Sequence, residues 1–116
     1  MGQTQAQLGS LSGNVGQYLD DGSFVGPVVG AVVQLYDSSG NLVAQTTTDG
    51  NGFYKFTGLA AGTYTITTTA DSSSVGTVNG TTDGQGGPGF DSISSIVLGA
   101  GQNGINYDFI QIIQPG

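Results

Sequence analysis

The sequence contains no cysteine, histidine, tryptophan, arginine or glutamate, and Lys55 is its only cationic side chain. Without cysteine and histidine, the chain cannot form thiol or imidazole nucleophile–base pairs, nor zinc sites built from those ligands. The net charge of −7 disfavours nucleic acid and anionic membranes as partners. We therefore predict that the chain is not an enzyme. For metal binding it offers aspartate oxygens, which suit a hard cation such as Ca²⁺.

Long apolar runs are also missing. The longest, Phe24–Val33, is interrupted by Gly26, Pro27 and Gly30, and a membrane helix needs about 18 apolar residues. We expect no membrane insertion. Residues 1–10 have neither a basic start nor an apolar centre, so we recognise no signal peptide and interpret the sequence as a mature fragment. Threonine, serine, glutamine and asparagine together supply 40 residues, and this uncharged polar surface favours an extracellular or cell-surface location.

What the sequence does contain is alternation of apolar and polar residues between clusters of glycine, asparagine and aspartate. This period of two predicts β-strands, and no window has a helical period of useful length. We predict an all-β fold, a seven-stranded antiparallel sandwich of two sheets. The expected strands lie near residues 11–19, 28–36, 42–48, 53–57, 63–69, 93–98 and 105–112.

The strands and turns define one module at residues 10–110, with an N-terminal tail or extra strand at 1–9 and a C-terminal tail at 111–116. Short hairpin turns are expected at Asp37–Asn41 and Asp49–Gly52, because aspartate, asparagine and glycine tolerate positive φ. By contrast, residues 71–90 are rich in glycine and serine. They predict a long loop, which either has a function of its own or has none.

Two strands have features that disturb simple alternation. Strict alternation would place Ile93 on one face of its strand and Ile96 and Leu98 on the other. A bulge near Ser94 and Ser95 would bring all three to the same face, and we predict one there. In the last strand, Ile105, Tyr107 and Phe109 are expected on one face and Ile110 and Ile112 on the other, unless the register slips.

Two segments make the chain recognisable. Residues 48–66, TDGNGFYKFTGLAAGTYTI, resemble the turn–strand–turn–strand signature of collagen-adhesin B-type and serine–aspartate-repeat (SdrD) B-like modules. Residues 91–109 are similar to the final strand pair of the SdrD subgroup. The resemblance covers about residues 10–110 and implies a prealbumin-like, Greek-key sandwich. Its core signature would comprise Tyr54, Phe56, Leu59, Tyr64, Ile66, Ile96, Leu98, Tyr107 and Phe109.

The resemblance also implies two chemical features that this sequence does not match. The family often binds calcium in a loop after its first strand, but the corresponding loop at 20–24 is shorter than the roughly 12-residue pattern of a dedicated site. The remaining metal candidates are Asp20 and Asp21, with Asp71, Asp83 or Asp91 folding back. Related modules carry an internal isopeptide bond, and we predict none here, because Lys55 is on the predicted outward face and there is no glutamate to assist.

The terminal segments suggest a different role. Leu8, Ile110, Ile112 and Ile113 belong to uncharged, strand-like ends without the charges that keep edge strands from pairing with other chains. They are candidates for strand addition between subunits. Exposed aromatic residues, for which Tyr18, Tyr36 and Phe53 are candidates, could instead stack on sugar rings.

These observations favour a non-catalytic, extracellular structural module, a spacer, stalk or adhesive unit of a bacterial surface or secreted protein. Its partners would be sister modules or identical subunits, with host or matrix glycans or proteins as further partners. One alternative is a filament subunit joined by terminal strand addition. Another is a carbohydrate- or calcium-binding module; apart from that calcium, we expect no cofactor.

Overall fold

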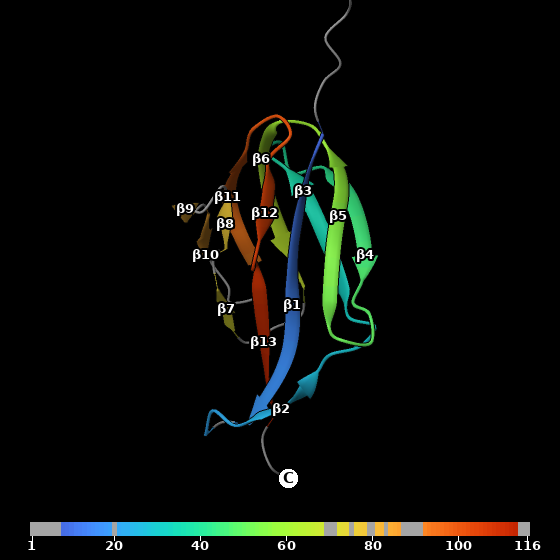
Figure 1. Cartoon of the computed structure of the whole chain (residues 1–116), viewed down its shortest axis with the longest axis vertical. Helices are drawn as coiled ribbons and strands as arrows, with labels where there is room; N and C mark the ends of the chain where they lie inside the picture. The colour runs from blue at the N-terminus through green and yellow to red at the C-terminus, as the bar shows by residue number, and fades with distance from the viewer. Residues whose placement is uncertain are drawn as a thin grey trace, which may run out of the picture.

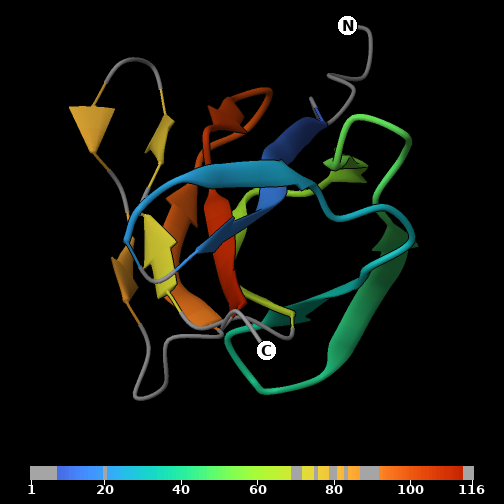
Figure 2. The ribbon, with the colours of Figure 1, turned by 90° about the horizontal axis from the view of Figure 1, so that it is seen from below.

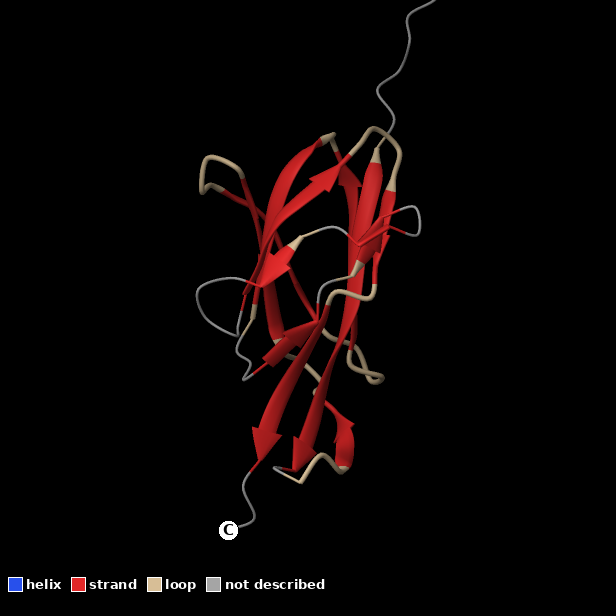
Figure 3. Ribbon diagram, turned by 90° about the vertical axis from the view of Figure 1, so that its left-hand side faces the viewer, coloured by secondary structure: helices blue, strands red, loops and turns tan. Residues whose placement is uncertain are grey.

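The computed structural model describes residues 8–19, 21–68, 72–74, 76–78, 81–82, 84–86 and 92–113. All regular secondary structure in these residues is β-strand (Figure 3). This part of the chain contains no helix that could span a membrane. The strands are β1 (Gly9–Leu19), β2 (Phe24–Pro27), β3 (Val32–Asp37), β4 (Leu42–Thr47), β5 (Phe53–Leu59), β6 (Gly62–Thr67), β7 (Ser72–Ser74), β8 (Thr77–Val78), β9 (Thr81–Thr82), β10 (Gln85–Gly86), β11 (Ser92–Leu98), β12 (Asn103–Ile105) and β13 (Asp108–Ile113).

The strands form two facing sheets. In the larger sheet β1 is central, with β12 and β13 along one edge and β5 and β2 along the other. The smaller sheet has the order β10-β11-β6-β3-β4. Figure 1 shows β1 and β13 side by side, and Figure 2, seen along the long axis, shows β3 and β4 facing the larger sheet. The predicted all-β, two-sheet sandwich is confirmed, with more strands than the seven expected.

A single apolar core fills the space between the sheets. Side chains alternate across each strand, so every second residue points inward. Tyr54, Tyr107 and Phe109 are the largest of the fully buried side chains, and Val28, Ala31 and Ala44 pack against the edge of the core. The core consists of Leu11, Val15, Val33, Leu35, Tyr54, Phe56, Leu59, Tyr64, Ile66, Val78, Ile93, Ile96, Leu98, Tyr107 and Phe109.

The chain crosses from the larger to the smaller sheet between β2 and β3. β2 pairs with β1, whereas β3 pairs with β4 and β6. The strand predicted near 28–36 is confirmed from Val32 onward, but residues 28–31 form the crossing and belong to no strand. Gly30 adopts a φ of 77° at this crossing. The buried Thr48 holds it, since its Oγ1 donates to the Val28 carbonyl at 2.5 Å and accepts from the Ala31 amide at 2.9 Å.

The first and last long strands are parallel. Val15 pairs with Phe109, and the register continues through Leu19 and Ile113; β1 also pairs with β12 in parallel. The other pairings are antiparallel, as expected from the sequence. Neighbours joined by a short turn must run antiparallel, but strands from opposite ends of the chain are not bound by that rule.

An interruption separates β12 from β13 and reverses one predicted side chain. Ile105 was expected to point inward with Tyr107 and Phe109, but it is 48% exposed while those two rings are buried. Asn106, at a φ of 66°, supplies the extra residue that shifts the alternation. The Tyr54 hydroxyl donates to the Tyr107 carbonyl at 2.5 Å, and a Cβ at Gly13 would collide with that carbonyl.

A second irregularity lies where the sequence predicts it. The pairing of β11 with β6 shifts register between Ile93 and Ile96, and Ser95 has a φ of 58°. Both isoleucines are fully buried. The predicted bulge is confirmed, and it returns the two side chains to the same face of the sheet.

The segment predicted as a long loop contains four short strands. β7 pairs with β13, β8 with β12 and β9, and β10 with β11. The prediction of a continuous loop over 71–90 is therefore wrong for these parts. Backbone hydrogen bonds form a ladder without any apolar alternation in the side chains, so a serine- and glycine-rich sequence gave no sign of them.

Two hairpin turns, Asp37–Asn41 and Asp49–Phe53, share one hydrogen-bond pattern. In each, the aspartate Oδ1 accepts from the amides two and four residues later, at 2.8–3.0 Å. The fourth residue is a glycine, Gly40 at a φ of 84° and Gly52 at 73°, whose amide donates to the aspartate carbonyl at 3.0 Å. Both predicted turns are confirmed.

Candidate functional site

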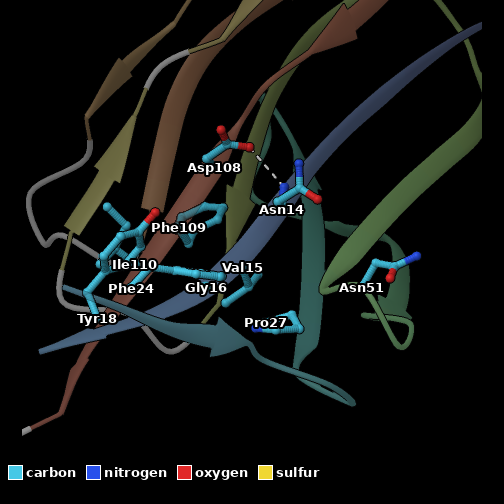
Figure 4. A pocket seen from close by; sticks show the side chains of 10 residues that line it. All are labelled: Asn14, Val15, Gly16, Tyr18, Phe24, Pro27, Asn51, Asp108, Phe109 and Ile110. Carbon is cyan, nitrogen blue, oxygen red and sulfur yellow. Dashed lines mark hydrogen bonds between the residues drawn. The ribbon is translucent and has the colours of Figure 1, made fainter.

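An open groove of about 400 Å³ lies over the second half of β1 (Figure 4). Asn14, Gly16 and Tyr18 share the face of β1 opposite the buried Val15, so the groove lies on the outer face of the larger sheet. β2, β13 and the turn between β4 and β5 complete it. It is lined by Asn14, Val15, Gly16, Tyr18, Phe24, Pro27, Asn51, Asp108, Phe109 and Ile110.

One end of the groove is aromatic. The rings of Tyr18 and Phe24 lie 5.1 Å apart between centroids, tilted by 59°, and Phe24 is 61% exposed. A Cβ atom at Gly16 would lie 3.2 Å from the Phe24 ring and 3.5 Å from the Tyr18 ring. The absence of a side chain at Gly16 therefore leaves space for the rings to lie over β1.

The other end of the groove is polar. Asp108 is partly buried, and its Oδ1 accepts a hydrogen bond from the Asn14 amide at 2.9 Å, the dashed line in Figure 4. The side chains of Asn14 and Asn51, which also line the groove, are exposed. A carboxylate has further acceptor sites when one oxygen is engaged, and each amide side chain both donates and accepts.

Beneath this end of the groove lies a buried phenol. Burial, with a smaller contribution from the negative charge of Asp108, raises the pKa of Tyr54 well above its ordinary value. Tyr54 therefore remains a neutral donor to the Tyr107 carbonyl under ordinary conditions. This hydrogen bond fixes the backbone between β12 and β13, immediately before the groove residue Asp108.

The predicted metal ligands are not brought together in the part of the chain that is described. Asp20, Asp71, Asp83 and Asp91 lie outside the described residues. Asp21 is exposed and accepts from the Ser23 amide at 2.9 Å, and this hydrogen bond lowers its pKa. Among the described residues, no three histidine, cysteine or acidic side chains lie close enough to hold a metal ion.

The predicted assembly residues lie at both ends of the larger sheet. Leu8 is 57% exposed next to the start of β1, Ile110 is partly buried and Ile112 is 41% exposed. The backbone of Ile113 belongs to β13, so the last strand ends one residue beyond the strand predicted near 105–112. β13 pairs with β1 of the same chain.

The core-signature residues all lie in the core. Tyr54, Phe56, Leu59, Tyr64, Ile66, Ile96, Leu98, Tyr107 and Phe109 are each at most 6% exposed.

The aromatic candidates for sugar stacking are separated. Tyr18 lines the groove, but Tyr36 lies on β3 in the other sheet, where its hydroxyl donates to the Gln34 Oε1 at 2.9 Å. Phe53, 38% exposed on β5, is not part of the groove lining. Sequence reasoning missed Phe24 and Asp108, because they come from distant segments and only the sheet brings them together.

Comparison with known proteins agrees with the fold. The profile of the SdrD B-like domain matches residues 14–109. Serine-aspartate repeat-containing protein C of Staphylococcus aureus, strains Newman and USA300, is 51% identical over 39 residues, which is 34% of this chain and 4% of that protein. The chain thus spans a small part of the length of these relatives.

A solved structure is similar over nearly the whole chain. It is GBS52, the minor pilin of Streptococcus agalactiae, with a TM-score of 0.58 and 16% identity, covering 96% of this chain and 48% of that one. At this identity the likeness concerns the fold alone.

Proposed function

This chain belongs to the SdrD B-like domain family, and from that premise we propose that it is a non-catalytic structural module, a load-bearing spacer or stalk unit of a bacterial surface or secreted protein. The relative and the pilin of similar fold support a role in bacterial surface structures. An amino-acid composition without histidine, cysteine, arginine or glutamate also favours structure over catalysis.

One observation carries this proposal, the parallel pairing of β1 with β13. Figure 1 shows β1 beginning at the upper end of the sandwich and β13 ending at the lower end. Five consecutive residue pairs, from Val15–Phe109 to Leu19–Ile113, join the two strands. A force that pulls the ends of the chain apart therefore slides these strands along one another.

Shearing two paired strands past one another loads their hydrogen bonds differently from peeling the strands apart. When two strands are sheared, all the hydrogen bonds between them carry the load together, whereas peeling from one end breaks them one after another. β1 is also held on its other edge by β5 and β2. Since unfolding under force is governed by the unfolding rate, this arrangement favours a slow response to tension along the module.

Single-molecule force spectroscopy tests the proposal by changing only the points of attachment. The chain has no cysteine, so an introduced cysteine provides a unique handle. Pulling through the two chain ends shears β1 against β13. Pulling between Asp21→Cys, just beyond β1, and the C-terminal end loads the same pair from one end and unzips it.

We expect a clearly higher unfolding force when the module is pulled through its ends. The unattached Asp21→Cys variant should unfold at nearly the same urea concentration as the parent, because Asp21 is exposed and loses only its hydrogen bond with the Ser23 amide, and it serves as the control. Equal forces in both geometries would exclude a load-bearing role for the β1–β13 pair.

Assembly through terminal strand addition has less support as an alternative. It requires a terminal strand available to another subunit, and β13 is paired with β1 on one edge and, over residues 108–110, with β7 on the other. Strand exchange between subunits would first have to break these pairs.

A further inference from the structure

We infer that the groove over Gly16 is a binding site for a neutral saccharide. This inference goes beyond the structural role proposed above and does not depend on it, because a spacer has no need of a ligand. It is based on the side chains that line the groove, the charge around them and the rigidity of the elements that hold them.

The aromatic end of the groove provides a stacking surface. Phe24 is 61% exposed on a short edge strand, and Tyr18 is only partly buried beside it. Neither ring belongs to the core. An aromatic face that packs against the C–H groups of a pyranose ring gains both area burial and a specific geometry, so the pair fits the apolar face of a sugar.

The polar end provides partners for sugar hydroxyls. Each hydroxyl both donates and accepts, and Asp108, Asn14 and Asn51 together offer both functions within the same groove. The Asn14 amide fixes one oxygen of Asp108 at 2.9 Å. The carboxylate is thus held in position before any ligand arrives, which lowers the cost of binding.

Charge decides which sugars fit. Asp108 lines the groove, the chain carries a net charge of −7, and Lys55 is its only cationic side chain. Uronic acids, sialic acids and sulfated sugars would meet repulsion from Asp108 with no cation in the lining to offset it, since Lys55, paired with Ser12 on the same face of the sheet, does not line the groove. Neutral hexoses and N-acetylhexosamines carry no such penalty.

The walls of the groove come from elements that hold one another in place. β1 is paired on both edges, and the turn that carries Asn51 is closed by two hydrogen bonds to Asp49 Oδ1. A volume of about 400 Å³ lies within the range of small-molecule sites. The site is open, so the affinity of a short oligosaccharide should be weak.

NMR titration of the ¹⁵N-labelled protein with cellotetraose and with chitotetraose, each to about 10 mM, tests the inference. We expect saturable shifts from at least one of these neutral probes, centred on the amides of the groove residues. A tetrasaccharide of heparin at the same concentration should leave those amides unchanged.

Variants then assign the binding to named side chains. Phe24→Ala and Tyr18→Ala should each weaken binding by about three- to tenfold, and Asp108→Asn by about tenfold. Tyr36→Ala removes a surface ring from the opposite sheet and should leave the affinity unchanged. Thermal unfolding of each variant checks that it is folded.

Several results would overturn the inference. The first is the absence of shifts with both neutral probes. The second is equal binding by the parent and a folded Phe24→Ala variant. The third is concentration-dependent dimerisation in sedimentation experiments that Phe24→Ala abolishes, which would assign the groove to a second copy of the chain.

Discussion

The two aspartate turns have the same internal hydrogen bonds but different surroundings. Gly40, in the Asp37 turn, has open space where a side chain would begin, with no atom within 4 Å. At Gly52, in the Asp49 turn, a Cβ would lie 2.5 Å from the Val15 carbonyl oxygen and 2.9 Å from the Pro27 Cβ. One turn faces solvent and the other packs against the larger sheet.

This difference shows that similar turn sequences can contribute unequally to the stability of the fold. The Gly52 carbonyl accepts from the Val15 amide at 2.8 Å, and the Val15 carbonyl accepts from Val28 at 2.9 Å. The Asp49 turn therefore connects the β4–β5 hairpin to β1 and to the crossing after β2. The Asp37 turn closes the β3–β4 hairpin, and outside that hairpin Asp37 pairs with Tyr64 of β6, but Gly40 at its tip touches no other element.

The largest expected effect follows from Gly52→Ala. The added methyl group must both adopt a φ near 73° and displace backbone atoms of β1. We expect a loss of about 3–4 kcal/mol in the free energy of unfolding, measured by urea denaturation.

Gly40→Ala is the matched control for that variant. It has the same change and a similar φ, 84°, but no contact, so it should lose only about 1 kcal/mol. Equal losses at the two glycines would show that backbone conformation alone matters, and that the packing of the second turn contributes nothing.

Removing the turn carboxylate should have an intermediate effect. Asp49→Ala abolishes two hydrogen bonds to amides and loosens the contact of Gly52 with Val15, so we expect a loss of about 2 kcal/mol in thermal or urea unfolding. Asp37→Ala should lose about 1 kcal/mol, because the tip of that turn, at Gly40, makes no contact that the lost hydrogen bonds would loosen. Asp49→Asn keeps an acceptor oxygen and should retain most of the stability; if it falls as far as Asp49→Ala, the negative charge is the stabilising feature.

Exchanging the middle residues of the turns should have a small effect. The double change Gly50→Ser and Asn51→Ser gives the second turn the sequence Asp-Ser-Ser-Gly of the first. Both positions are exposed, and a side chain at residue 50 meets open space. We expect the free energy of unfolding to change by no more than about 0.5 kcal/mol; a larger loss would place part of the difference between the turns in these residues.

The smallest effect concerns a third aspartate, Asp21, and depends on pH. The Ser23 amide lowers the pKa of Asp21 below its ordinary value, so its contribution is present at neutral pH and is lost as the pH falls through the folded-state pKa. Asp21→Asn should therefore slightly flatten the decrease in melting temperature between about pH 5 and pH 2. Identical pH profiles for the variant and the parent would show that this hydrogen bond stabilises the charged and the protonated forms of Asp21 equally.

Much of the sandwich follows from the sequence because it is encoded locally. Aspartate, asparagine and glycine specify the two hairpin turns, and alternation places Tyr54, Phe56, Tyr64 and Ile66 inward. Even the bulge at Ser95 follows from the break in alternation between Ile93 and Ile96. These features depend on neighbours along the chain, so no knowledge of distant contacts is needed.

The features that sequence reasoning missed depend on distant segments. Asn106 in a left-handed conformation turns Ile105 outward, and what holds this break in place is the Tyr54 hydroxyl bonded to the Tyr107 carbonyl, from another strand. The groove likewise combines Tyr18 and Phe24 with Asp108, about ninety residues later. The pattern around each residue alone did not indicate either feature.

The position of Lys55 has a consequence for proteolysis. Trypsin cleaves after lysine or arginine, and Lys55 is the only such residue in the chain; it lies within β5, paired with Ser12 of β1. A protease binds its substrate as an extended, unpaired segment, so the bond between Lys55 and Phe56 becomes accessible only when β5 leaves the sheet. The rate at which trypsin divides the chain into two fragments therefore reports directly how often this part of the sandwich opens.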